Sequence, residues 1–307
     1  MQTHPTEQAA WKAAGDPGGP RSPNGQPVPP AAATARNGRH AALLGQARLD
    51  ADTAAFYCQA IRTLADAGVP FLVGGAYAFE RYTGIARHTK DFDIFLQPQQ
   101  LDRALEVFAN AGYHTELTFP HWLGKAFCGG EFIDIIFSSG NGIVRVDDEW
   151  FAHAVEAEVL GMPLKLAPPE EMIWSKAFIL ERERYDGADV AHLLRAQAEH
   201  LDWERLLQRF GDNWRVLLSH LTLFGFIYPC ERDKIPTGVM RELLGRLEAE
   251  LRTPPSAERV CQGTLVSREQ YLVDVERWGY ADARLQPRGN MTRQQVDHWT
   301  AAIDSKD

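Results

Sequence analysis

The stretch FLVGGAYAFERYTGIARHTKDFDIF, which runs from Phe71 to Phe95, decides how this chain folds. It opens with a short apolar run that Pro70 precedes and Gly74-Gly75 follows, a pattern that predicts a buried strand ending in a tight turn. The two glycines let the backbone approach another group closely and leave amide groups unpaired at the start of a helix. Phosphate oxygens bind well at such a place, because the unpaired amides and the helix dipole both favour an anion.

The same stretch ends in a second predicted strand, Asp91 to Leu96, which carries two acids one residue apart. Because side chains alternate along a strand, we expect Asp91 and Asp93 on one face and an apolar pair on the other. Two carboxylates this close repel each other unless a positive charge lies between them. A hard divalent cation, which prefers oxygen ligands, fits that position. The alternative is an acid at the polar end of a turn, because an Asp-x-Asp triplet alone is common.

A third acid, Asp134, lies in the middle of the apolar segment Glu131 to Phe137. A carboxylate in a buried strand is costly unless it is paired, protonated or bound to metal. A buried salt bridge or a hydrogen-bonded aspartate is therefore one interpretation. Taking Asp134 together with Asp91 and Asp93, we favour three carboxylates that converge on one metal site.

The segment RHTKDFD, residues 87–93, follows a double glycine and precedes a strand with one Asp, and this arrangement resembles a known family. It is similar to the nucleotidyltransferase superfamily of the DNA polymerase β type. Within that superfamily it looks most like the minimal nucleotidyltransferases and the AbiEii-like toxins. The resemblance covers about Asp52 to Leu194. The family more often has Gly-Ser where this chain has Gly74-Gly75, so phosphate binding here falls to backbone amides.

The resemblance implies an enzyme that transfers a nucleoside monophosphate from an NTP, with ATP as one candidate, to a hydroxyl or phosphate acceptor and releases pyrophosphate. It implies Mg²⁺ as the cofactor, with two ions expected and Mn²⁺ as a substitute. On this pattern Asp91, Asp93 and Asp134 are the catalytic and metal-binding residues. The first two would bridge both ions. Asp134 would bind the ion on the acceptor side and assist deprotonation of the attacking oxygen.

The resemblance also implies a set of nucleotide-binding residues. The amides of Gly74 and Gly75 would hold the β- and γ-phosphates. Arg87 and Thr89 would line the same mouth. Lys176 would neutralise the triphosphate from a helical second domain.

A second acidic pair, Asp186 and Asp189, follows Lys176 at a spacing similar to the helical signature of the AbiEii-like group. This pair is a candidate site of the second domain. The alternatives are ordinary ones. Lys176 can be a surface lysine with a buried stem, and the two acids can be helix caps that pair with Arg182 or Arg184.

The order of elements predicts an α+β protein, in which a small mixed β-sheet with helices on one face precedes an α-helical domain. Residues 172–183 are predicted as one helix of that second domain. We expect a disordered arm, the nucleotidyltransferase domain, the helical domain and a polar C-terminal extension at residues 1–40, 41–167, 168–252 and 253–307.

Composition, charge and residue spacing argue against several classes of protein. The chain has 307 residues with a net charge of −9, which disfavours an extended, non-specific hold on nucleic acid. Four widely spaced cysteines without a C-x-x-C pair are typical of reduced thiols in the cytoplasm. No apolar run approaches the roughly 18 residues that cross a bilayer, so we expect no membrane partner. The histidines show no H-x-x-x-H spacing, which leaves a zinc hydrolase unsupported.

The expected partners are an NTP and an acceptor, which the sequence leaves open among RNA, a small molecule and a protein. The AbiEii-like resemblance adds a cognate antitoxin. Two other functions stay as alternatives. One is a nucleotide-binding module that kept the fold and lost activity, and the other is a metal-dependent phosphohydrolase with water as the acceptor.

Overall fold

A computed structural model describes residues 50–87 and 89–302 of the chain. The predicted disordered arm, residues 1–40, lies outside the described residues. The described residues belong to one compact unit. Its predicted division into a nucleotidyltransferase domain, a helical domain and a C-terminal extension stays a prediction.

The stretch around the double glycine folds into the expected elements. β1 (Leu72–Val73) leads into α3 (Gly75–Thr83), and β2 (Phe92–Phe95) follows. Gly84 ends α3 in the left-handed region at φ +71°, which glycine adopts without strain. The sequence signals for strand, turn, helix and strand are thereby confirmed.

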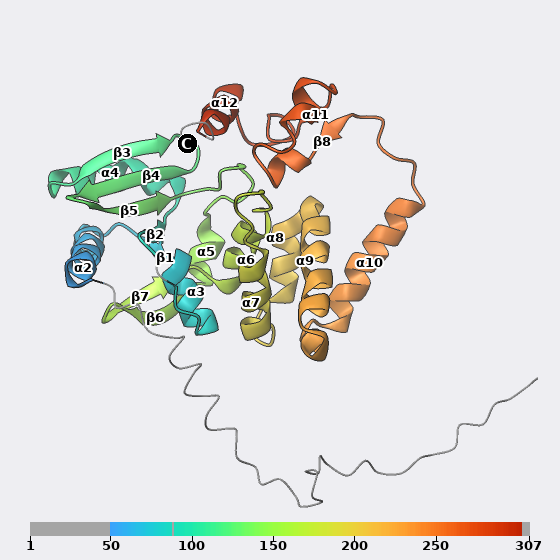
Figure 1. The fold of residues 1–307 in the computed structure, drawn as a ribbon. Helices are drawn as coiled ribbons and strands as arrows, with labels where there is room; N and C mark the ends of the chain where they lie inside the picture. Colours follow the sequence, from blue (N-terminus) through green and yellow to red (C-terminus); the bar gives the residue numbers. More distant parts are fainter. Residues whose placement is uncertain (1–49, 88, 303–307) are drawn as a thin grey trace, which may run out of the picture. The chain divides into compact units, whose positions relative to one another are not determined.

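One mixed sheet contains β1 and β2 together with β3 (His114–Phe119), β4 (Leu123–Cys128), β5 (Glu131–Ile136), β6 (Val155–Val159) and β7 (Met162–Leu166). The spatial order is β3-β4-β5-β2-β1-β7-β6, with β2 in the middle (Figure 1). β2 runs antiparallel to β1 and parallel to β5. This confirms the predicted mixed sheet and its α+β class.

Helices cover the face of the sheet that carries the apolar side chains of β2. Tyr57 of α2 (Ala51–Asp66) lies 5.0 Å from Phe92, measured between ring centroids. α4 (Leu101–Asn110) contacts α2, β3 and β4. Phe92 and Ile94 are fully buried under these helices. Asp93 of β2 is only partly buried, as the alternation predicted from the sequence requires.

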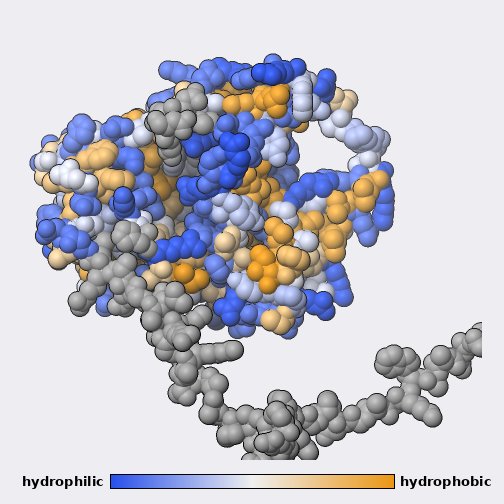
Figure 2. All heavy atoms as spheres, in the orientation of Figure 1, coloured by the Kyte–Doolittle hydropathy of each residue, from blue (hydrophilic) through white to orange (hydrophobic). Residues whose placement is uncertain are grey.

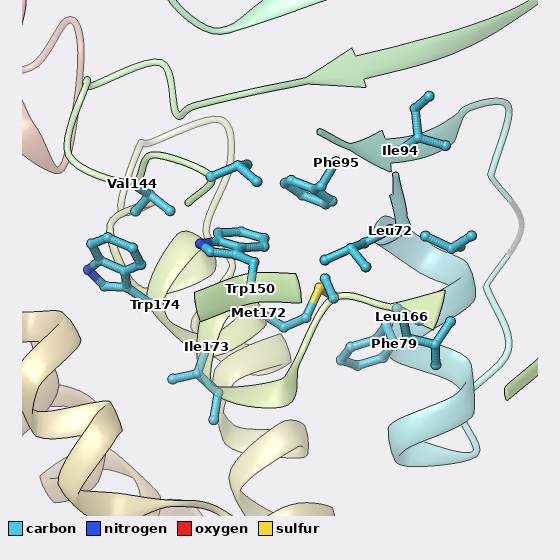
Figure 3. Packing of buried hydrophobic residues seen from close by; sticks show 14 of the residues in the cluster. Leu72, Phe79, Ile94, Phe95, Val144, Trp150, Leu166, Met172, Ile173 and Trp174 are labelled. Carbon is cyan, nitrogen blue, oxygen red and sulfur yellow. The ribbon is translucent and has the colours of Figure 1, made fainter. Parts of the chain in front are cut away.

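On the opposite face, Phe95 joins the sheet to the helical part of the chain. Its ring lies 5.0 Å from Trp150 of α5 (Asp148–Ala152), centroid to centroid. Figure 3 shows the Trp150 indole beside Phe95, with side chains of α6 (Pro169–Ala177) around it. Trp150 is fully buried, so the sheet and the helices share one hydrophobic core.

The helical part continues with α7 (Gly187–Gln197), α8 (Trp203–Phe210), α9 (Trp214–Ile227) and α10 (Thr237–Leu251). Figure 2 shows apolar side chains on the surface of α9 and α10. The large exposed ones on these two helices are Leu223, Phe226, Ile227, Leu244 and Leu251. No helix within residues 50–87 and 89–302 is long and apolar enough to cross a membrane.

The prediction of one helix over residues 172–183 is wrong. α6 ends at Ala177, and the chain then reverses so that Leu180 and Tyr185 form an antiparallel bridge. The Leu180 amide donates to the Val266 carbonyl at 3.0 Å, so it does not continue the helix. A contact with a distant segment overrides the local helical pattern.

Beyond α10 the chain adds short elements: β8 (Val260–Cys261), α11 (Leu272–Glu276), β9 (Ala281–Asp282) and α12 (Arg293–Ala301). This extension packs on the loop after β5, residues 138–142. The buried Asn141 amide of that loop donates to the Leu265 carbonyl at 2.7 Å. The Trp299 ring of α12 occupies the space that a side chain at Gly140 would need. The loop is therefore fixed from the C-terminal side.

Candidate active site

Two of the predicted acids lie side by side on neighbouring strands. Asp93 of β2 and Asp134 of β5 are partners in the parallel register, so their side chains project from the same face of the sheet. Asp91 lies two residues before Asp93, just outside β2, and its charge raises the pKa of both Asp93 and Asp134. The structure therefore brings Asp93 and Asp134 to one face, opposite the apolar side chains under α2 and α4, with Asp91 within electrostatic reach of both.

The charges of the three acids act on one another. Burial, followed by the carboxylates of Asp134 and Asp91, raises the pKa of Asp93 from 3.8 to about 7. The positive charges of Lys176 and Arg184 oppose this rise in pKa. A carboxyl group that titrates near neutral pH beside two others is typical of a functional site.

Asp134 also has a cationic partner. Lys125 of β4 is directly opposite Asp134 in the antiparallel register, and its Nζ lies 2.5 Å from Asp134 Oδ1. The same ammonium lies 4.1 Å from the centre of the Phe132 ring. Burial raises the pKa of Asp134, and the hydrogen bond and charge of Lys125 act against that rise. Asp134 thus forms a partly buried ion pair, close to the buried salt bridge that the sequence left open as one interpretation.

The position of Asp93 requires glycine at the start of α3. Gly75 has φ +53°, in the left-handed region, and a Cβ there would lie 1.7 Å from Asp93 Oδ2. A Cβ at Gly74 would lie 2.0 Å from the Phe95 ring. The double glycine lets the helix begin directly against the acids, which explains physically why this chain has no serine at position 75.

Two other predicted nucleotide contacts already take part in the fold. The Gly74 amide donates to the Asp93 carbonyl at 2.9 Å, so this amide is already paired, and only Gly75 and the later amides of the first turn stay candidates for a phosphate. The Thr89 hydroxyl accepts a hydrogen bond from the Asp91 amide at 3.2 Å. This bond fixes the entry of the chain into β2.

A cationic cluster surrounds the second acidic pair. Lys176 Nζ lies 3.2 Å from Asp186 Oδ2 and 2.7 Å from Asp189 Oδ2. Arg87 Nη1 lies 2.5 Å from Asp189 Oδ1, and Arg184 Nη2 lies 3.1 Å from Asp186 Oδ2. The two acids are buried, with exposed fractions of 9% and 6%. Three cations therefore share two carboxylates and leave one net positive charge in the cluster.

The cationic cluster acts on the acids of the sheet. Lys176 and Arg184 both lower the pKa of Asp93, which places their charges within electrostatic reach of it. The Arg87 guanidinium lies 4.4 Å from the centre of the Phe79 ring and keeps 39% of its side chain exposed. A phosphate group that approaches this cluster has to share the three cations of the cluster with Asp186 and Asp189.

The three acids fit an oxygen-ligated divalent cation by their chemistry. They carry hard oxygen donors, and a bound cation would oppose the rise in the pKa of Asp93 that burial and then the carboxylates of Asp134 and Asp91 cause. Within the described part of the chain, no three His, Cys, Asp or Glu side chains lie close enough as they stand to hold a metal ion. Lys125 also occupies one oxygen of Asp134. Ligation by all three acids therefore needs a change of side-chain position.

Sequence reasoning missed Lys125 and Arg184 as members of the site. Lys125 is the one charged residue of its strand, but its partner follows only from the register of β4 against β5. The sequence pattern indicates Arg184 only as a surface partner of Asp186. Its Nε and Nη2 each donate to that carboxylate at 3.1 Å.

A family described as uncharacterised nucleotidyltransferases matches residues 30–216 of the chain. The match spans more than half of the sequence and contains the double glycine, the three acids and the cationic cluster. The chain belongs to this nucleotidyltransferase family. The resemblance to the nucleotidyltransferase superfamily is thereby confirmed, and the protein is a nucleotidyltransferase. The narrower likeness to AbiEii-like toxins stays a prediction.

No curated protein matches the chain. Similar solved structures include the antibiotic-resistance factor ANT(2'')-Ia, at 15% identity over 56% of this chain and 98% of that chain, with a TM-score of 0.41. Lincomycin-bound lincosamide antibiotic adenylyltransferase LnuA is 15% identical over 46% and 94%, with a TM-score of 0.34. JHP933 from Helicobacter pylori is 14% identical over 66% and 98%, with a TM-score of 0.32. At these TM-scores the likeness carries no argument, so family membership rests on the sequence match.

Replacing Gly75 with alanine should displace the Asp93 carboxylate and reduce nucleotidyl transfer by about a hundredfold, the effect of misplacing a reacting group by an ångström. Gly84→Ala is the matched control, because Gly84 also has a positive φ but has open space around its Cα. Both variants should lose about 1 kcal/mol of unfolding free energy from the left-handed backbone. Pyrophosphate release and urea unfolding measure the two effects. Equal activities of the two variants would contradict the close fit of Gly75 to Asp93.

Asp93→Asn should stabilise the metal-free protein at pH 8. Folded Asp93 keeps its proton up to about pH 7, whereas the unfolded chain releases it near 3.8. The folded state binds more protons between these values, so the stability of the unaltered protein falls as the pH rises through this window and stays low above it.

At pH 8 the Asn variant should gain about 2 kcal/mol, less than the full shift implies because the carboxylate keeps some hydration. Urea unfolding in EDTA at pH 8 and at pH 3.5 measures this gain, which should vanish at the lower pH. A gain that is the same at both pH values would show that the ionisation of Asp93 does not cause it.

Proposed function

We propose that this nucleotidyltransferase moves a nucleoside monophosphate from an NTP to a hydroxyl or phosphate acceptor and releases pyrophosphate. The observation that carries the proposal is the pairing of Asp93 with Asp134 on one sheet face, with Gly75 packed against Asp93 at the start of a helix. Phosphate groups and carboxylates repel each other, so they lie close together only where cations bind both. The site combines such acids with a helix N-terminus and a cationic cluster.

In the proposed reaction an acceptor oxygen attacks the α-phosphorus. A new P–O bond forms, the bond from the α-phosphorus to the α–β bridging oxygen breaks, and pyrophosphate leaves with that electron pair. The acceptor loses a proton, and Asp134, the acid of β5 in register with Asp93, would assist its removal. The raised pKa of Asp134 suits this task, since a base works best when its pKa lies nearer to the ambient pH.

The triphosphate would lie between the sheet and α6. Gly75 and the following amides of α3 would donate to phosphate oxygens, as the first turn of a helix has unpaired donors. Lys176 and Arg87 would add positive charge from the cationic cluster, and Thr89 would line the entrance. Arg184 joins this set because its charge reaches Asp93.

Asp91, Asp93 and Asp134 would hold Mg²⁺, two ions in the full proposal, with Mn²⁺ as a substitute. When bound, Mg²⁺ stabilises the negative charge that builds up on the phosphate oxygens. The chain's own contribution is to concentrate carboxylates on neighbouring strands of one sheet, so that only their side chains have to move when cation and substrate bind.

The acceptor is an RNA, a small molecule or a protein, and ATP is the first NTP to test. A cytoplasmic setting and a cognate antitoxin are parts of the proposal that rest on the sequence alone. A phosphohydrolase with the same acids would release phosphate or diphosphate and leave no acceptor labelled. An inactive binding module would bind the NTP and release nothing.

Asp93→Ala should abolish transfer while the protein stays folded, because the change removes a charge that folding had to bury. The test incubates the full chain with Mg²⁺, a cell extract and each NTP in turn, labelled at the α-phosphate. Label should enter one fraction (RNA, protein or small molecules) with the unaltered protein and not with Asp93→Ala.

Asp66→Ala is the matched control, an exposed acid on α2 that should keep full activity. Full labelling by Asp93→Ala would show that Asp93 has no part in the reaction. Release of phosphate without any labelled acceptor would favour the phosphohydrolase.

A further inference from the structure

The acids of the site belong to a row of four charged residues that crosses the sheet. Asp93 is in register with Asp134, Asp134 with Lys125, and Lys125 with Glu116 of β3. Residues in register share a face, so the order across β2, β5, β4 and β3 is acid, acid, base, acid. Lys125 therefore has a carboxylate on each side of it.

The two carboxylates beside Lys125 differ in their surroundings. Asp134 is 13% exposed and lies 2.5 Å from Lys125 Nζ. Glu116 is exposed to solvent on the outer strand. Opposing residues of an antiparallel pair have Cβ atoms only about 5 Å apart, so the long lysine side chain reaches either carboxylate. The Phe132 ring supports the ammonium in its present position over the site, at 4.1 Å from the ring centre.

A divalent cation and the Lys125 ammonium compete for the same carboxylate. Two cations a few ångströms apart repel strongly in a partly buried site, where charges are poorly screened. The metal-free site has carboxylates in need of positive charge, and Lys125 supplies part of it from within the chain. A cation that binds Asp134 must first displace the Lys125 ammonium.

We infer that Lys125 is an internal counter-ion that occupies Asp134 in the metal-free protein and moves to Glu116 when a divalent cation binds. The free protein then holds a divalent cation weakly, and cation and NTP enter together, since the phosphates add the ligands that the acids alone do not supply. Lys125 is a positioning residue in this account. The inference rests on the proposed function in one respect, that Asp134 is a ligand of the cation.

The experiment measures Mn²⁺ binding to the full chain by electron paramagnetic resonance at pH 8, without nucleotide. Lys125→Met should bind Mn²⁺ about tenfold more tightly than the unaltered protein, because it keeps the shape and loses the competing charge. Lys125→Arg should bind as the unaltered protein does. Lys165→Met, which removes an exposed lysine of β7, is the control and should change nothing.

Glu116→Gln gives a second test at a position where the fold tolerates change, because the side chain is exposed. It should weaken Mn²⁺ binding by about twofold, because the displaced Lys125 loses the exposed ion pair that it would form with Glu116. The two variants thus shift the affinity in opposite directions.

An affinity of Lys125→Met that equals or falls below that of the unaltered protein would overturn the inference. An affinity of Glu116→Gln equal to or above that of the unaltered protein would overturn the movement to Glu116. The proposed function is judged separately by label transfer. If the unaltered protein transfers no label but Lys125→Met binds Mn²⁺ more tightly, the proposed function is rejected and the counter-ion role of Lys125 stands.

Discussion

The repulsion between Asp93 and Asp134 is the constraint on which the rest of the site depends. Their strands are parallel and in register, so neither side chain can leave the shared face without moving β2 or β5. Burial is the larger cause and this repulsion the next, and together they raise the pKa of Asp93 to about 7. A pair of carboxylates in this position lowers the free energy of unfolding. Active sites commonly carry such a cost in stability, because the residues that function requires are not those that stabilise the fold best.

Positive charge reaches this pair from two directions. Lys125 comes from the sheet itself and neutralises Asp134. Lys176 and Arg184 come from the segment around α6 and act on Asp93 at longer range. Charged side chains of opposite sign therefore act on one another between the sheet and the helices. The Phe95–Trp150 contact joins the same two parts of the structure. An NTP would enter this layer as a polyanion, and divalent cations bound to its phosphates would lower its repulsion from the three carboxylates.

Much of this arrangement follows from the sequence. Alternation places Asp91 and Asp93 on one face, and punctuation by glycine and proline marks the strands around them. The pairing of Lys125 with Asp134 does not follow, because it depends on the register between two strands, and register is a tertiary property. The end of α6 at Ala177 does not follow from local sequence either, since the Leu180 amide donates to the carbonyl of Val266, far along the chain. Local pattern predicts elements, and long-range contacts decide where they stop and which charges meet.

The most direct test of the account is to locate Mn²⁺ by its anomalous scattering in crystals of the full chain grown with Mn²⁺ and a non-hydrolysable NTP. The account predicts manganese bonded to oxygens of Asp91, Asp93 and Asp134, with the triphosphate against the first turn of α3. Manganese bound elsewhere, with these three carboxylates free of both metal and nucleotide, would contradict it.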